Sequence, residues 1–142
     1  MSDPYDLDRF VQAQAPVINQ VRRELAEGQK RSHWMWFVFP QIAGLGHSPM
    51  ARRYAIASLE EAVAYLAHPV LGWRLVECTA LVNAVRGRSA HQIFGSPDDM
   101  KFRSCMTLFA TARPEQPEFA DALVQFYDGR RDPATLAILD GT

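Results

Sequence analysis

The amino-acid sequence predicts a mainly α-helical protein, a bundle of about six or seven helices with one Trp-rich extended loop, in a single domain over residues 1–142. Apolar residues recur at three- and four-residue spacing along most of the chain, which is the period of amphipathic helices. Residues 34–39 are the exception, because a dense aromatic run that is stopped by Pro40 cannot continue as a long helix. The length is that of one ordinary domain, and no repeat or linker interrupts it.

Two helices are predicted before residue 30. An apolar face marks the first helix, and its residues are Leu7, Phe10, Val11 and Gln14. Pro16 fits the first turn of the second helix, because the amide hydrogen that proline lacks has no helical partner there. The second helix has Val17, Val21 and Leu25 on one face, and Gly28 is its expected end.

The middle of the chain predicts two further helices. Ser58 followed by Glu61 is a capping-box pattern, in which the serine hydroxyl accepts a hydrogen bond from an amide three residues later. This helix ends at His68-Pro69, and the next one runs to Gly87. The second of the two carries apolar residues at helical spacing, including Leu71, Leu75, Cys78 and Val85.

The clearest helix start in the sequence is Ser96-Pro97-Asp98-Asp99. We expect Ser96 to cap the helix, Pro97 to occupy its first turn, and the two acidic residues to lie at its positively charged end. Two shorter helices are expected near the C-terminus. The core should be formed by the inward residues of three helices, namely Leu66, Leu75, Phe102, Met106 and Phe109.

Composition and charge exclude several classes of protein. A net charge of −1 gives no basic excess for a phosphate backbone, so we expect no binding to duplex DNA. The N-terminus is acidic and no window approaches a membrane-spanning apolar run, which predicts a cytoplasmic protein without signal peptide or membrane contact. Cys78 and Cys105 lie in apolar helical patterns without metal-ligand spacing, which predicts buried thiols, no metal site and no cofactor.

Residues 31–48 are the most informative segment of the chain. Four aromatic side chains lie there beside polar groups and two glycines, and they are Trp34, Trp36, Phe37 and Phe39. We interpret this segment as a short strand or extended loop that is buried on both sides. A functional site is expected here.

Several motifs resemble one bacterial family. They are the Trp-x-Trp-Phe, Phe-Pro-Gln and Gly-Leu-Gly block of residues 34–46, the helix of residues 58–66, the His68-Pro69-Val70-Leu71-Gly72 run and residues 101–109. Over nearly the whole chain they resemble the family called domain of unknown function 1810, which implies a small single-domain protein without an established function. The helix start at residues 58–61 and the Lys101-Phe102 pair also resemble, more weakly, the ADP-ribose-processing superfamily that includes N-glycosidases.

The aromatic candidates each have two interpretations. Trp34 and Trp36, two residues apart, would point the same way from a strand, where paired indoles either sandwich a planar ring or fill a core. Gln41 offers a donor and an acceptor for a base edge or for a neighbouring loop carbonyl. His33 is either a ligand contact that could act as a general acid or base, or a hydrogen-bonded structural residue.

The glycines and the cation on the later helix extend the candidate site. Gly44 and Gly46, followed by Ser48, either let backbone amides approach a phosphate or form a tight turn. Lys101 and Ser104 add donors that could contact an anionic ligand. The default role of Lys101 is an ion pair with the acidic residue three positions before it.

Our first functional hypothesis is that the chain binds a nucleotide-like small molecule, such as ADP-ribose or a phosphoribosyl compound, and cleaves its N-glycosidic bond. Aromatic faces would hold the base, and Lys101 or backbone amides the phosphate. Glu61 or Asp98 is the candidate catalytic carboxylate, which would assist a water molecule at the ribose carbon.

The second hypothesis is a helical protein-interaction module without catalytic activity, whose Trp-rich loop is either core or an interface hot spot. The two hypotheses differ in geometry. Ligand binding requires one cavity at the N-terminal half of the helix after Pro97, walled by Trp34 or Trp36 and surrounded by Gln41, the Gly44–Gly46 turn, Lys101 and Ser104. A convex aromatic patch instead favours a protein partner. The oligomeric state is left open.

Overall fold

The computed structural model describes residues 3–141, which form ten helices and no strand. The helices are α1 Asp8–Gln14, α2 Ile18–Glu27, α3 Met35–Val38, α4 Pro49–Arg53, α5 Leu59–Ala67, α6 Leu71–Asn83, α7 Ala90–Phe94, α8 Asp98–Ala112, α9 Pro117–Tyr127 and α10 Pro133–Asp140. This confirms the predicted mainly α fold. Among the described residues, no helix has both the length and the apolar character to cross a membrane.

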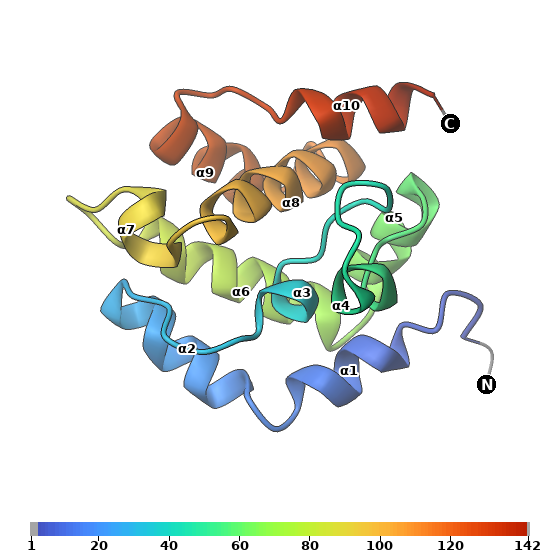
Figure 1. The fold of residues 1–142 in the computed structure, drawn as a ribbon, viewed down its shortest axis with the longest axis horizontal. Coiled ribbons are helices and arrows are strands. Elements are labelled where there is room, and N and C mark those ends of the chain that lie inside the picture. The colour runs from blue at the N-terminus through green and yellow to red at the C-terminus, as the bar shows by residue number, and fades with distance from the viewer. Residues whose placement is uncertain (1–2, 142) are drawn as a thin grey trace.

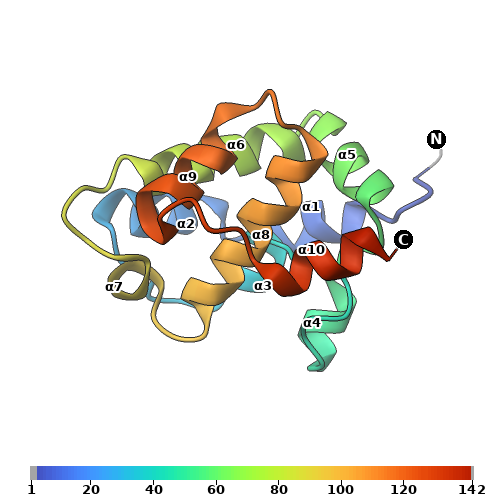
Figure 2. The same ribbon diagram turned by 90° about the horizontal axis from the view of Figure 1, so that it is seen from above.

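Helix α8 lies at the centre of the bundle. Figures 1 and 2 show it between α9 and α10 on one side and the N-terminal helices on the other. It packs against α5, α7, α9 and α10, and its residues from Ser104 to Ala110 are all buried. A helix that is covered on every side needs small or apolar side chains all round, and this segment supplies them.

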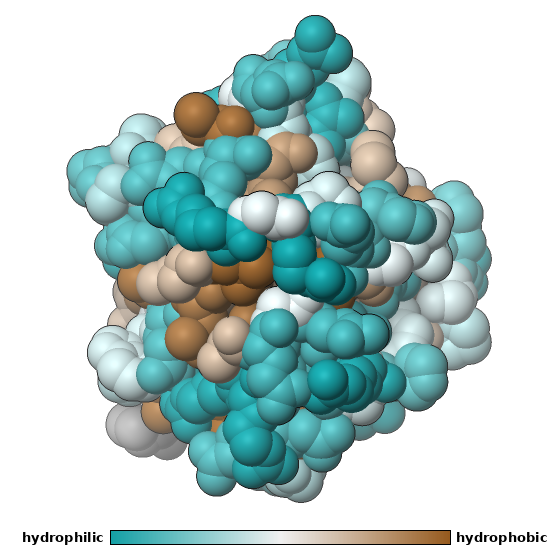
Figure 3. All heavy atoms as spheres, turned by 90° about the vertical axis from the view of Figure 1, so that its left-hand side faces the viewer, coloured by the Kyte–Doolittle hydropathy of each residue, from teal (hydrophilic) through white to brown (hydrophobic). Residues whose placement is uncertain are grey.

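The predicted core residues are buried. Phe102, Met106 and Phe109 are completely covered, and Leu75 and Leu66 are nearly so. They belong to one hydrophobic cluster that extends through all the larger helices. Figure 3 shows one face of the molecule, on which hydrophilic side chains surround a smaller hydrophobic area.

Several local signals act as the sequence predicted. Gly28 ends α2 in the left-handed conformation, with φ of 75°, which glycine adopts without steric cost. The Ser58 hydroxyl accepts a hydrogen bond from the Glu61 amide at 3.1 Å and so caps α5. Cys78 and Cys105 are free and buried, and burial raises the pKa of the Cys78 thiol to about 12.

The Trp-rich segment differs from the prediction. Residues 35–38 form the short helix α3 instead of an extended strand. Successive helical residues are turned by about 100°, so Trp34 and Trp36 point in different directions. Trp34 is 1% exposed in the core, whereas Trp36 is half-buried.

The start of α8 also differs from the prediction. The helix begins at Asp98, Pro97 occupies the cap position, and no side chain caps it, so Ser96 is not the N-cap. The first amides bond backbone carbonyls instead: Asp99 N–H donates to Gly95 at 2.9 Å, and Lys101 N–H to Pro97 at 3.2 Å.

Candidate functional site

The Trp-rich segment is anchored by Glu24, a buried carboxylate on α2. It accepts hydrogen bonds from the amides of Arg31 at 2.7 Å and Ser32 at 3.1 Å, from the Ser32 hydroxyl at 2.6 Å and from the Trp34 indole at 2.9 Å. Burial by itself raises the pKa of Glu24, but these hydrogen bonds outweigh it and lower the pKa to about 2. Trp34 is therefore a structural residue of the core and not a wall of a pocket.

The anchored loop places Lys30 against the start of α8. Its amide donates to the Ile93 carbonyl at 2.7 Å, and its side chain is only 8% exposed. The Lys30 Nζ lies 2.8 Å from Asp98 Oδ2 and 5.3 Å from the centre of the Trp34 ring. A buried ammonium group is thus held beside a carboxylate.

A second lysine faces the same carboxylate. Lys101 Nζ lies 3.6 Å from Asp98 Oδ1 and 5.3 Å from the centre of the Trp36 ring. The two positive charges of Lys30 and Lys101 therefore face the single negative charge of Asp98, which leaves one positive charge in excess. The sequence contains two lysines, and both of them lie here.

These charges line a hollow of about 290 Å³. Its walls come from the anchored loop, α3 and the start of α8, and the lining residues are Lys30, His33, Met35, Trp36, Ser96, Pro97, Asp98 and Lys101. The structure thus brings together His33, Trp36, Asp98 and Lys101 of the predicted site.

A second, separate cavity holds the glycine turn. Gln41, Gly44 and Gly46 line it together with Trp36, and its volume of about 20 Å³ has room for about one water molecule. A Cβ atom on Gly46 would lie 2.6 Å from the Cβ of Ala51, so this glycine permits close packing within the turn. The cavity at these residues is too small to hold a nucleobase.

Two predicted serines have structural roles. Ser48 caps α4, since its hydroxyl accepts from the Ala51 amide at 3.1 Å. Ser104 is buried, and its hydroxyl lies 3.1 Å from Asp132 Oδ2, to which it donates. Neither serine lines the hollow or the small cavity, which differs from the predicted single cavity.

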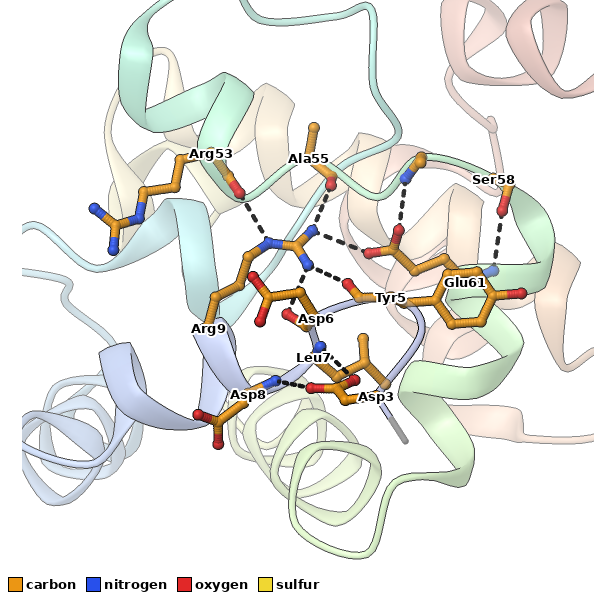
Figure 4. Close-up of polar contacts among 11 residues, drawn as sticks. Asp3, Tyr5, Asp6, Leu7, Asp8, Arg9, Arg53, Ala55, Ser58 and Glu61 are labelled. Carbon is orange, nitrogen blue, oxygen red and sulfur yellow. Dashed lines mark hydrogen bonds and ion pairs between the residues drawn. The ribbon is translucent and has the colours of Figure 1, made fainter. Parts of the chain in front are cut away.

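Glu61 belongs to a structural network at the N-terminus (Figure 4). Its carboxylate accepts from Arg9 Nη2 at 3.0 Å and from the Ala57 amide at 3.1 Å. Arg9 also donates to four backbone carbonyls, those of Tyr5, Asp6, Arg53 and Ala55. Glu61 is 4% exposed at its side chain and lines neither cavity at Trp36, so the geometry removes it from the candidate catalytic groups.

Three of the first four amides of α8 are not free donors to the hollow. The amides of Asp99, Met100 and Lys101 all bond carbonyls of Gly95 or Pro97. An anion in the hollow would consequently bind to side chains, above all to the two ammonium groups.

Sequence reasoning missed Lys30 as a site residue. The signal that was available is its position directly after the helix end at Gly28 and directly before the Trp-rich segment. What the sequence does not show is the partner, because Asp98 comes from a distant helix.

Fold and hollow together define a small all-α protein with a cationic hollow beside an aromatic wall. The chain belongs to the family described as protein of unknown function (DUF1810), whose model matches residues 4–139. The crystal structure of the conserved hypothetical protein Rv1873 from Mycobacterium tuberculosis is similar at 58% identity and a TM-score of 0.97, over 99% of this chain and 100% of that one. No curated protein matches. The family resemblance is confirmed, whereas the likeness to N-glycosidases is not shown by these comparisons.

Proposed function

We propose that the protein binds a small, phosphorylated, nucleotide-like molecule in the hollow at the start of α8. The observation that carries the proposal is the pair of ammonium groups, Lys30 and Lys101, around the single carboxylate of Asp98. A partly buried excess of positive charge is unfavourable unless an anion is near it. A phosphate group, with a charge of about −2 at neutral pH, would balance this excess.

The aromatic wall supports a ligand that also has an apolar or planar part. Trp36 and Met35 line the hollow. Since Lys101 already lies over the Trp36 ring at 5.3 Å, the phosphate belongs at this end, and the rest of the ligand contacts the remaining surface of Trp36 and Met35. His33 lies at the exposed side of the hollow, where it can contact either part.

The size of the hollow favours a compact ligand. A volume of about 290 Å³ is at the lower end of the range for small-molecule pockets, which is about 300–1,000 Å³. A mononucleotide or a phosphoribosyl compound fits this size better than ADP-ribose, which has two sugars and two phosphates.

Bond cleavage has less support than binding. Among the residues that line the hollow, Asp98 is the one carboxylate, and each of its oxygens faces a lysine. N-glycosidic cleavage would therefore depend on Asp98 alone, whereas glycosidases usually use two carboxyl groups. An interface hot spot at the Trp-rich loop also has less support, because Trp34 is buried and Trp36 lines a concave surface.

The test compares AMP, ribose 5-phosphate, adenosine and ADP-ribose by thermal shift and calorimetry. We expect AMP or ribose 5-phosphate to stabilise the protein, by about 2.7 kcal/mol at 100 times the dissociation constant, and adenosine to have no effect. Lys101→Met should abolish this stabilisation and leave the unfolding free energy within about 1 kcal/mol. Arg52→Met, which removes an exposed cation on α4, is the matched control and should bind normally.

Chemical labelling gives an independent readout. Because both lysines line the hollow, a bound phosphate ligand should slow the modification of Lys30 and Lys101 by an amine-reactive reagent, while the terminal amine reacts at an unchanged rate. Equal stabilisation by adenosine and AMP, or undiminished AMP binding by Lys101→Met, would overturn the proposal. Release of free adenine that depends on Asp98 would add catalysis to binding.

A further inference from the structure

A third tryptophan is displayed on the surface, away from the hollow. Trp73 on α6 is 62% exposed, while its neighbours Leu71 and Leu75 point into the core. Gly72 faces α5 so closely that a Cβ atom there would lie 2.0 Å from the Leu66 carbonyl oxygen. The backbone at this point is therefore held firmly against α5, and Trp73 projects outward from a rigid helix.

Trp73 borders a hollow of about 360 Å³ at the corner between α5 and α6. The apolar part of the lining comes from Leu66, Pro69 and Val76, and Arg113 contributes a cation. The remaining polar residues of its lining are His68 and Gln116, whose side-chain amide donates to the Glu118 carboxylate at 2.7 Å. No carboxylate is itself among the lining residues. A partly apolar hollow with a cation in its lining matches an apolar group that lies next to an acid.

One of the two arginines near Trp73, Arg113, is only weakly paired. Arg113 has one acidic neighbour, Glu115, at 3.9 Å, and this glutamate side chain is 78% exposed. Such a long and solvated ion pair contributes little. On the other side of Trp73, the Arg22 guanidinium lies 6.0 Å from the ring centre and is bound to Glu77 at 2.7 Å, so it is fixed in place.

We propose that this corner binds a peptide segment of another protein that carries an apolar side chain next to an acidic one. The apolar side chain enters the hollow beside Trp73, and the carboxylate replaces Glu115 as the partner of Arg113. Trp and Arg are the residue types that dominate binding energy at protein interfaces. Trp73 comes from α6 and Arg113 from the C-terminal end of α8. The charge of the lining favours an acidic peptide over a basic one.

The experiment selects 12-residue peptides from a random phage-displayed library on the wild-type protein, with soluble Trp73→Ala protein as the competitor. We expect selected peptides to contain Asp or Glu within two positions of Leu, Phe or Trp. In calorimetry, Trp73→Ala and Arg113→Glu should each weaken the selected peptide at least tenfold. Val124→Ala, which removes another exposed apolar side chain, and Arg52→Glu, which changes another exposed charge, should leave it unchanged.

Three outcomes would overturn the inference. They are a selection without enrichment of acidic residues, a selected peptide that binds Trp73→Ala as tightly as wild type, and sedimentation that shows the wild-type chain self-associating through Trp73. Circular dichroism checks that the variants fold, which we expect because both side chains lie at the surface. AMP binding in the hollow at the start of α8 is a second check that the variants fold. The peptide result does not depend on it, because Trp73 and Arg113 do not line that hollow.

Discussion

Two regions of this protein are built on ion pairs, and they differ in how completely the charges are satisfied. In the N-terminal network, Arg9 donates to four carbonyls and to Glu61, which lines neither cavity at Trp36. In the hollow at the start of α8, which has a volume of about 290 Å³, Lys30 and Lys101 share the carboxylate of Asp98. A charge whose hydrogen bonds are all internal holds the fold together, whereas the excess charge at the cavity is the feature on which the proposed ligand site rests.

The largest expected effect tests the structural half of this comparison. Arg9→Met should lower the free energy of unfolding by about 3–5 kcal/mol, because it leaves the nearly buried Glu61 carboxylate without its cation. Urea unfolding at pH 7 measures the loss, and AMP binding should be unchanged. Arg23→Met, at an exposed position of α2, should cost less than about 0.5 kcal/mol. If Arg9→Met is as stable as wild type, the network does not hold the N-terminus.

The next prediction concerns Glu24, a carboxylate whose hydrogen bonds hold the loop that lines the hollow. Glu24→Gln should cost about 2 kcal/mol at pH 7, because charge-assisted hydrogen bonds to the loop are weakened. Since folding lowers the pKa of Glu24 from 4.5 to about 2, its contribution is complete above pH 4.5 and disappears as the pH falls toward 2. Urea unfolding at pH 7 and pH 3 should therefore show a smaller difference between variant and wild type at pH 3. An equal difference at both pH values would contradict this role.

The third prediction breaks the balance in the hollow itself. Asp98→Asn keeps the shape and removes the one negative charge, so AMP should bind about tenfold more tightly, which corresponds to about 1.4 kcal/mol. Calorimetry measures the dissociation constant. Weaker binding by the variant would show that Asp98 serves to position the lysines and not to offset their charge.

The smallest effect concerns two serines at helix starts. Ser89 forms a complete capping box with Gln92 at the start of α7, so Ser89→Ala should cost about 1 kcal/mol. Ser96 is exposed and caps nothing, so Ser96→Ala should change stability by less than about 0.5 kcal/mol. Thermal unfolding of the two variants measures the difference. Equal losses would mean that Ser96 stabilises α8 after all.

The helices were predictable because their signals are local. Apolar spacing, Gly28 and the Ser58 cap act within a few residues, and each of them has the expected role. The start of α8 is shifted by one residue because backbone carbonyls, which have no sequence signature, took the place of the serine hydroxyl at Ser96.

The candidate site was less predictable. Lysine at position 101 and aspartate at position 98 could be assigned to one helical face, and the structure places them there. Ser104 lies about one turn further along the same helix, and its hydroxyl donates to Asp132 instead. Side chains one helical turn apart can have different partners, because the packing of other elements against the helix differs from turn to turn.

The sequence by itself determined the helical class, the core and the family resemblance, since each depends on residue order over short distances. Only the tertiary structure decided that Trp34 is core and Trp36 faces a hollow, because α3 replaces a period of two with one of 3.6 residues. It also decided that Lys30 meets Asp98, and that Glu61 meets Arg9. Ion pairs between distant residues form where packing brings them together, and no local pattern records that.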